Sequence, residues 1–412
     1  YGWTFAKWTM AASAIGVVCG LIGTMFHFGV HEVTAFRGTH PWMLYLLPLA
    51  GFVIVSFYKL TETDGLGTDD IIDAVHEGKR LPILLLPAIF FGTVLTHLCG
   101  GSAGREGAAL QMGGTIGQCM GRTFRLDDRD LRVATLAGMA AFFSALFGTP
   151  LAATVFAIMV ISIGVLYHVA LYPSLLAALV AYGVSVRLGV EPTRFTVAVP
   201  DQSVGMFVRV AALGVLCALV SILFCKLMHG AGHLMKRIKN PWLRVICGGF
   251  AVIALTWIFG TDYNGAGMDI VTRAIEQETV AVPWAFLLKL VFTAVTLAAG
   301  FKGGEVVPSF FVGATFGCAV SPLLGLPVGF GAAVGLAAVF CGVTNCPVAS
   351  TLLAVELFGA EGMLYFALAC CLSYMLSGYQ GLYSSQTILY SKLKAQFINV
   401  HTNAYHAGEK TE

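Results

Sequence analysis

The stretch GREGAALQMGGTIG, residues 104–117, decides the fold, because a related stretch, GEVVPSFFVGATFG, occupies residues 304–317. In each copy a glycine-rich break carries a glutamate, Glu106 or Glu305, and an apolar segment follows. The shift of 200 aligns the glycines, whereas the glutamates fall one residue out of that register. A repeat of this length in an apolar chain predicts two related halves whose broken helices converge near the middle of a membrane.

The repeat extends outward from this stretch in both directions. Aligned pairs occur on either side of it: Gly65 with Gly265, Gly67 with Gly267, Asp69 with Asp269, Thr93 with Thr293, Gly100 with Gly300 and, at a shift of 197, Pro150 with Pro347. The two copies therefore cover most of the chain.

Composition indicates whether the chain lies in water or in a membrane. Hydrophobic residues make up 57% of the 412 residues and charged residues only 11%, whereas soluble domains carry about 25% charged residues. The chain is therefore an integral membrane protein. A net charge of +2 gives no sign of a nucleic-acid partner.

Membrane spans need about 20 apolar residues. Segments that meet this need are 8–30, 42–60, 82–99, 168–187, 206–228, 243–260, 284–300 and 362–378. Shorter pieces cut by Gly or Pro lie at 107–121, 133–147, 150–165, 306–325, 327–343 and 347–358. These predict tilted or half-crossing helices, which protein or a water-filled cavity must cover.

The sequence predicts an all-α membrane protein with a single domain over residues 1–412. We expect a first half at about 1–190, a linker at about 188–205 and a second half at about 206–380. A final helix over about 381–398 and a short polar tail complete the chain. Residues 226–244 are basic and lack acids, unlike the matching loop at 31–41. This difference favours halves of inverted topology.

The first glycine break predicts an anion site. Gly104 and Gly107 free the backbone on either side of Arg105 and Glu106. The N–H groups at a helix start and the positive end of its dipole attract anions. Glu106 can compete with a transported anion as a built-in one and be released by a proton. The alternative is a buried glutamate that caps its own helix.

The second copy repeats the arrangement. Gly304 and Glu305 precede Val306, and Pro308 suits the first turn of a helix. We expect its N-terminus to face that of the first copy across a central region. The alternative is that Glu305 merely forms a salt bridge with Lys302.

Two further breaks add candidate residues. Gly65, Leu66 and Gly67 precede an expected helix whose first turn holds a pair of capping aspartates, Asp69 and Asp70. Tyr383 follows Gly381 at the start of the expected last helix, and its phenol can donate a hydrogen bond to an anion without bringing a charge.

The sequence carries no motif for a metal-dependent enzyme, because it has no HExxH pair. Eleven scattered cysteines and the pairs His27/His31 and His229/His233 have no acidic metal partner. We expect no enzyme activity, no cofactor and no metal. A purely structural scaffold is disfavoured by two Gly-flanked acids within apolar segments.

The motifs together resemble the CLC family of anion channels and proton-coupled anion antiporters. They are GREG with QMGGTIG at 104–117, the PLA…F pattern at Pro150–Phe156, and LYS at 382–384. The resemblance implies two inverted halves per subunit and a homodimer. It also implies that Glu106 is the gate and that Tyr383 faces the central anion site.

Departures from the chloride-handling pattern favour one branch. Leu66 stands where those members have serine, Glu305 where they have an apolar residue, and Met159 or Val160 where their antiporters have an acid. The chain thus looks like the fluoride-selective bacterial branch, whose members export fluoride in exchange for protons across the cell's inner membrane. Glu305 and Val306 then inherit a fluoride-site role. A chloride/proton antiporter or chloride channel is the alternative.

The chemistry suits fluoride. Stripping water from this small, basic halide is costly, so strong donors must replace that water. Backbone N–H groups and a protonated Glu106 are such donors. Glu305 either excludes larger halides or assists proton transfer, and the sequence leaves both roles open. Val307 is apolar and offers no hydroxyl.

Overall fold

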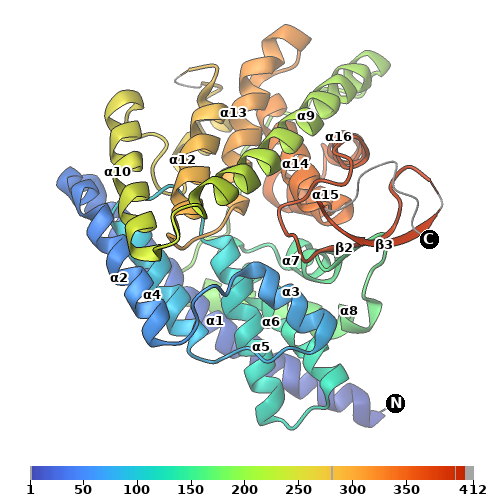
Figure 1. Cartoon of the computed structure of the whole chain (residues 1–412). Helices are drawn as coiled ribbons and strands as arrows, with labels where there is room; N and C mark the ends of the chain where they lie inside the picture. Colours follow the sequence, from blue (N-terminus) through green and yellow to red (C-terminus); the bar gives the residue numbers. More distant parts are fainter. Residues whose placement is uncertain (1, 280–281, 395, 404–412) are drawn as a thin grey trace.

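The computed structural model describes residues 2–279, 282–394 and 396–403 (Figure 1). Over these residues the chain is mostly helical, as predicted. In chain order the elements are α1 (Gly2–Thr39), η1 (Pro41–Leu46), α2 (Leu47–Leu60), α3 (Thr68–Glu77), α4 (Leu85–Leu98), α5 (Glu106–Thr123), α6 (Asp128–Phe147), α7 (Pro150–Met159), β1 (Ser162–Ile163), η2 (His168–Ala170), α8 (Leu171–Arg187), α9 (Val204–Met235), α10 (Pro241–Phe259), α11 (Met268–Glu276), α12 (Ala285–Ala299), α13 (Val306–Leu324), α14 (Val328–Thr344), α15 (Pro347–Phe358), α16 (Met363–Leu376), β2 (Thr387–Tyr390) and β3 (Phe397–His401).

The helices repeat in order and in packing. α1 to α8 correspond to α9 to α16, and in both sets the fifth helix packs on the sixth, the sixth on the eighth and the first on the eighth. Across the halves α2 contacts α10 and α7 contacts α15, each the counterpart of the other. Residues 188–203 connect the two sets and form no helix or strand. The predicted fold of two inverted repeats with tilted and broken helices is confirmed.

Seven helices of the described chain are long and apolar enough to cross a membrane. α1 has 38 residues, so it is roughly 57 Å long and must tilt in a hydrocarbon core about 30 Å thick. The piece at 133–147 belongs to the spanning helix α6, because Asp127 caps this helix in a polar sequence by accepting from the N–H of Asp130 at 2.8 Å. Conversely, the predicted spans at 82–99, 284–300 and 362–378 contain helices of only 14 or 15 residues.

Small residues let the central helices approach closely. A Cβ added to Gly117 of α5 would lie 2.1 Å from the carbonyl oxygen of Ala134 in α6, and one on Gly317 of α13 would lie 2.2 Å from that of Gly331 in α14. Such contacts are typical of membrane helices, where close backbone approach drives association. The repeated glycines therefore serve packing in the same way in both halves.

The C-terminal segment differs from the prediction. The described residues of 381–398 form no helix; a turn at Ser384 and Ser385 is followed by β2, which pairs parallel with β1 and antiparallel with β3. Two features explain this outcome. The TILY sequence of β2 places Ile388 in a fully buried position between the half-buried Thr387 and Leu389, and β1, far away in sequence, offers an edge for pairing. The strands lie beside α15 and α16 in Figure 1.

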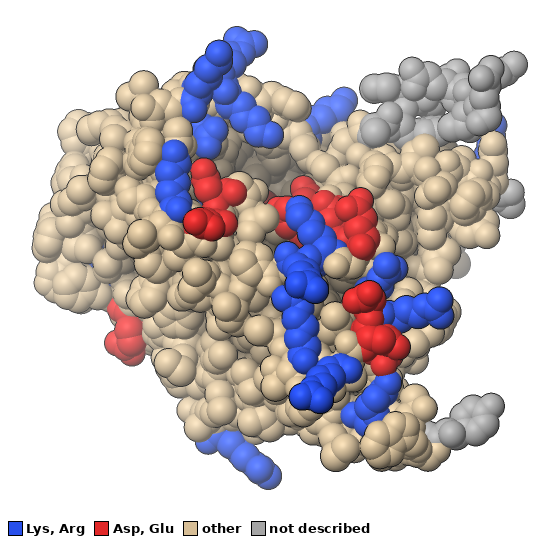
Figure 2. All heavy atoms as spheres, turned by 60° about the horizontal axis from the view of Figure 1, so that its bottom comes forward, with Lys and Arg blue, Asp and Glu red and all other residues tan. Residues whose placement is uncertain are grey.

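The surface divides by polarity. Large apolar side chains such as Trp3, Leu60, Phe91 and Trp257 are exposed, as expected for contact with lipid. Figure 2 shows basic and acidic side chains gathered around a hollow on the face that lies at the bottom of Figure 1, while the flanks are mostly uncharged. The chain is therefore a multi-pass membrane protein with a charged aqueous face.

Candidate functional site

The two glycine breaks meet at the centre of the molecule. The N–H of Gly104 donates to the carbonyl of Gly304 at 2.7 Å, and the N–H of Gly304 donates back to Gly104 at 2.8 Å. This isolated antiparallel bridge joins the residues just before α5 and α13. A Cβ on Gly304 would lie 2.2 Å from the backbone nitrogen of Gly107, so the approach requires glycine. The two helix starts thus face one region, as the sequence predicts.

The bridge fixes the register of the two acidic residues. Gly104 pairs with Gly304, so Arg105 and Glu305 hold equivalent positions, and both are N-cap residues. Glu106, the first residue of α5, therefore corresponds to Val306 rather than to Glu305. The halves place an arginine and a glutamate at matching points, which gives the site an asymmetric charge on a symmetric backbone.

Glu106 is completely buried between the halves. Its Oε2 accepts from the N–H of Arg105 at 2.9 Å, and the N–H of Val307 in α13 also faces its carboxylate. Its Oε1 lies 3.6 Å from the Nε of Arg105 but has no hydrogen-bond donor among the described residues. The carboxylate thus lies on donors from both helix starts, where an exogenous anion would also be stabilised.

Several backbone donors that were predicted to bind an anion are used within the protein. Gly104 and Gly304 bond to each other, Leu66 donates to the carbonyl of Thr63 at 3.2 Å, and Gly67 donates to Asp70 at 2.9 Å. Buried backbone N–H groups need acceptors, and these four find them within the protein. A role for these four N–H groups in anion binding stays a prediction, and it would require them to exchange these internal acceptors for the anion.

The remaining predicted donors are the backbone N–H groups of Arg105, Gly107 and Gly65. That of Arg105 is taken by Glu106. Gly107 lies in the first turn of α5 and Gly65 lies in the loop before α3, with a φ of +84° that favours glycine. A role for these two in anion binding stays a prediction.

A cavity of about 310 Å³ opens beside this junction. It is lined from both halves by Tyr58, Gly65, Leu66, Gly67, Thr68, Asp69, Asp70, Ile89, Gln111, Leu297, Phe301, Lys302, Gly303, Glu305, Leu382 and Tyr383. It therefore brings together the 65–67 loop, Glu305 and Tyr383, three separately predicted parts of the site. Glu106 is completely buried and is not among the residues that line this cavity.

Tyr383 is held by its backbone and leaves its hydroxyl unused. The carbonyl of Tyr383 accepts from the hydroxyl of Thr402 at 2.6 Å, and the N–H of Leu382 donates to Val343 at 2.9 Å. The phenol is 3% exposed, its oxygen has no hydrogen-bond partner among the described residues, and it lies within electrostatic range of Glu305 and Glu106. A buried, unpaired hydroxyl in this position can donate to an anion.

Glu305 does not form the salt bridge that was its alternative explanation. Among the described residues, no carboxylate oxygen lies within 4.0 Å of the Lys302 ammonium; its Nζ instead lies 4.1 Å from the centre of the Tyr58 ring. A Cβ on Gly107 would lie 3.6 Å from Oε2 of Glu305. The Glu305 carboxyl group therefore reaches the start of α5, next to Glu106.

The paired aspartates have separate tasks. Asp70 caps α3 through the N–H of Gly67 and also forms an ion pair with Lys79 at 2.8 Å, as a capping role predicts. Asp69 instead accepts from the N–H of Ser385 at 3.0 Å. This bond ties the turn that carries Tyr383 to the first turn of α3.

Two polar residues that line the cavity were not predicted as parts of the site. Gln111 of α5 donates to the hydroxyl of Thr68 at 3.0 Å, and both residues line the cavity. Lys302 supplies the cavity with a cation. The signals were present, since Gln111 belongs to the quoted stretch and Lys302 adjoins the second glycine pair. Their cavity-facing positions depend on contacts between segments that are remote in sequence.

Gly304→Ala is expected to abolish transport and to lower the free energy of unfolding by roughly 1–3 kcal/mol, as overpacked sites do. The added methyl would overlap the backbone of Gly107 and force the two helix starts apart. Ion flux into liposomes and thermal unfolding in detergent measure the two effects. Gly230→Ala in α9, where a Cβ has no neighbour within 4 Å, is the matched control and should leave both unchanged. Normal flux in Gly304→Ala would contradict the requirement for glycine.

Two inverted halves, helix starts that meet at their centre and buried acids beside a polar cavity together define a CLC-type membrane ion-transport protein. Comparison with known proteins agrees: the family described as voltage gated chloride channel matches residues 50–378. The chain belongs to this family.

Individual known proteins are similar to the chain in sequence and in structure. A "chloride/fluoride channel protein" of Pseudomonas syringae pv. tomato is 38% identical over 399 residues, which cover 94% of this chain and 88% of the relative. The crystal structure of a CLC-type fluoride/proton antiporter is 32% identical, with a TM-score of 0.91 over 94% of this chain and 99% of the other. A slow cyanobacterial Cl⁻/H⁺ antiporter, 20% identical with a TM-score of 0.77 over 90% and 94%, shares the fold.

Proposed function

We propose that this protein is a fluoride/proton antiporter that exports fluoride from the cytoplasm in exchange for protons. The observation that carries the proposal is the position of Glu305. It is the N-cap of α13, it lines the central cavity together with Tyr383, and its carboxyl group reaches the start of α5. The similarity to a solved fluoride/proton antiporter supports the same assignment.

In this proposal Glu106 alternates between anion mimic and proton carrier. Its carboxylate accepts from the start of α5 and faces an N–H of α13, so it competes with an incoming anion for the same stabilisation. Protonation removes this competition and lets the side chain leave. A protonated carboxyl group can then donate one hydrogen bond to the anion, which couples the movement of proton and fluoride.

The polar groups of the cavity favour fluoride over larger halides. Fluoride holds its water tightly, so transport requires replacement donors. Tyr383 provides an unused hydroxyl and Lys302 a cation at the same cavity. Hydrogen bonds that involve a charged partner are shorter and stronger than neutral ones, and the small basic anion gains most from them. Leu66 offers no hydroxyl to chloride.

We further propose a homodimer in the bacterial inner membrane, with one pathway in each subunit and no enzymatic activity. In each subunit Tyr383 and Glu305 contribute to the anion pathway and Val306 to the fluoride-site loop. The expected partners are fluoride, protons and the lipid bilayer.

Fluoride efflux from liposomes with simultaneous recording of external pH tests the function. Efflux of fluoride driven by its gradient should draw protons into the liposomes and raise the external pH. Matched chloride-loaded liposomes should show far slower efflux. Equal efflux of both halides, or fluoride efflux without proton movement, would contradict a fluoride/proton antiporter and favour a chloride transporter or an uncoupled channel.

A further inference from the structure

A second cavity, distant from the ion pathway, is lined by three arginines. Arg80 follows α3, Arg122 lies in the last turn of α5 and Arg132 lies near the start of α6. They surround a space of about 230 Å³ whose other lining residues are Ala74, Gly78, Gln118, Leu126, Asp128 and Leu131. We call this space the arginine cavity.

The arginines lack acidic partners. Among the described residues, none of the three forms an ion pair within 4.0 Å. Arg122 donates to the side-chain oxygen of Gln118 at 2.5 Å, and the negative end of the α5 dipole accounts in part for its position. Arg132 has no such helix end, and its Nε is buried without a hydrogen-bond partner. A buried unpaired donor on a charged group is costly unless a ligand satisfies it.

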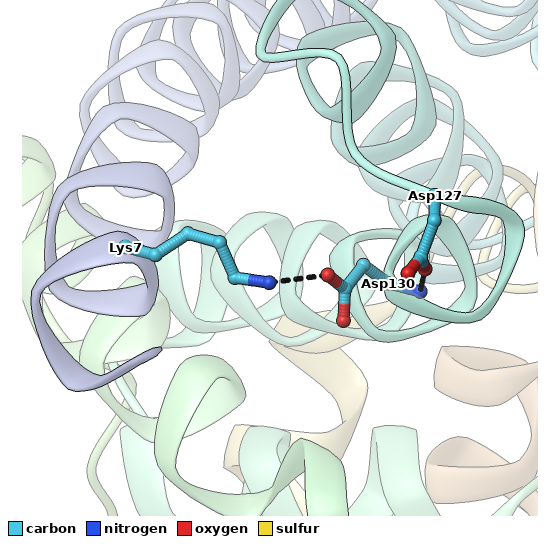
Figure 3. Close-up of polar contacts among 3 residues, drawn as sticks. All are labelled: Lys7, Asp127 and Asp130. Atoms are coloured by element: carbon cyan, nitrogen blue, oxygen red, sulfur yellow. Dashed lines mark hydrogen bonds and ion pairs between the residues drawn. The ribbon is translucent and has the colours of Figure 1, made fainter. Parts of the chain in front are cut away.

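Two acids near the arginine cavity, Asp127 and Asp130, are engaged elsewhere. Figure 3 shows Lys7 of α1 reaching across to Asp130 of α6, with which it forms an ion pair, while Asp127 accepts from the backbone N–H of Asp130 at 2.8 Å. Neither lines the arginine cavity, whose one acidic lining residue is Asp128. Three guanidinium groups against one carboxylate leave an excess of positive charge that suits a phosphate group, because guanidinium binds phosphate in bidentate fashion.

An apolar groove adjoins the arginine cavity. It has a volume of about 480 Å³ and shares Leu126 with the cavity. Its apolar lining is Trp3, Met10, Ala11 and Phe124, and its charged lining is the Lys7–Asp130 pair with Arg125 and Asp127. Trp3 is 78% exposed at the start of a spanning helix, and tryptophan in this position marks the membrane interface. A charged pocket and an apolar groove thus meet at the level of the lipid headgroups.

We propose that this pair of features is a binding site for an anionic phospholipid, with its phosphate in the arginine cavity and an acyl chain along the groove. Basic pockets between membrane helices bind anionic headgroups by the same physics. The site connects to the transport machinery, since α3 and α5 begin beside the central cavity and both end here.

Lipid titration of the whole chain in mild detergent, read by native mass spectrometry, tests the proposal. Phosphatidylglycerol should bind at least about 10-fold more tightly than phosphatidylcholine with the same acyl chains. Arg122→Gln/Arg132→Gln should remove this preference, because each charge-assisted bond lost weakens binding about 10-fold or more. Lys236→Gln/Arg237→Gln, an equal change of charge on two exposed residues elsewhere, should keep it.

Each remaining outcome decides the matter. Equal binding of the two lipids by the unmodified chain would overturn the proposal without any variant, so a double variant that fails to fold leaves the test intact. Loss of preference in both double variants would show general charge attraction and would also overturn it. Binding of inorganic phosphate that is lost in Arg122→Gln/Arg132→Gln, together with equal binding of the two lipids, would assign the cavity to free phosphate and reject the lipid.

Discussion

Glu106→Gln is expected to move fluoride without protons. Glutamine keeps the size of the side chain and its acceptor oxygen, so it can still accept from the N–H of Arg105, which Glu106 does now at 2.9 Å. It cannot take up and release a proton at neutral pH. Proton uptake driven by a fluoride gradient should therefore fall by about 100-fold or more, the scale of a lost proton-transfer group.

Simultaneous fluoride-electrode and pH recordings from liposomes measure both fluxes. Glu32→Gln is the matched control, because the Glu32 side chain is 77% exposed on α1 and its loss should leave coupling intact. The structure adds a constraint. Glu106 is the only acid whose carboxylate faces donors from both helix starts among the described residues. Persistent proton uptake in Glu106→Gln would show that another group carries the proton and would reject Glu106 as the gate.

The sequence predicted the central architecture because its glycine breaks recur at a fixed spacing in the two halves. Gly104 and Gly304 recur at a fixed shift, and the structure shows that their backbones bond directly. The sequence also showed that Glu305 lies one residue out of register with Glu106. The bridge between Gly104 and Gly304 shows that Glu305 is the counterpart of Arg105. Local patterns and repeats thus indicated which residues approach the centre.

Other features depend on contacts that a single sequence does not display. The C-terminal hairpin forms because β2 pairs with β1, more than 200 residues earlier. The local sequence does not reveal this distant partner, and a helix was predicted there instead. The first turn of α6 is charged, so it was not predicted to be helical. It is helical because Asp127 caps the helix by accepting from the N–H of Asp130. The internal bonds of the Gly67 and Leu66 N–H groups likewise depend on loop geometry rather than on residue type.

Replacing Glu305 by valine, an apolar residue of the kind that chloride-handling members carry there, is expected to reduce discrimination between fluoride and chloride by about 10–100-fold. The carboxyl group lines the central cavity beside Tyr383. When protonated it offers a strong donor, which fluoride accepts better than chloride, and when ionised it repels any anion that remains at a distance. Loss of one hydrogen bond to a charged partner costs about 1.5–3 kcal/mol, which corresponds to the expected change in the flux ratio.

Glu305→Gln separates the two roles that remain open for this residue. The amide keeps the volume and a weaker neutral donor, so partial discrimination should survive, and proton coupling should be unchanged if Glu305 acts only on anion choice. Halide efflux measured separately for fluoride and chloride, with pH recorded in each case, distinguishes the variants, and Glu361→Gln on the exposed turn before α16 serves as the control. If Glu305→Gln lost proton uptake while it retained fluoride selectivity, the side chain would belong to the proton route. Unchanged selectivity in Glu305→Val would show that the donors of α5, α13 and Tyr383 suffice to choose the anion.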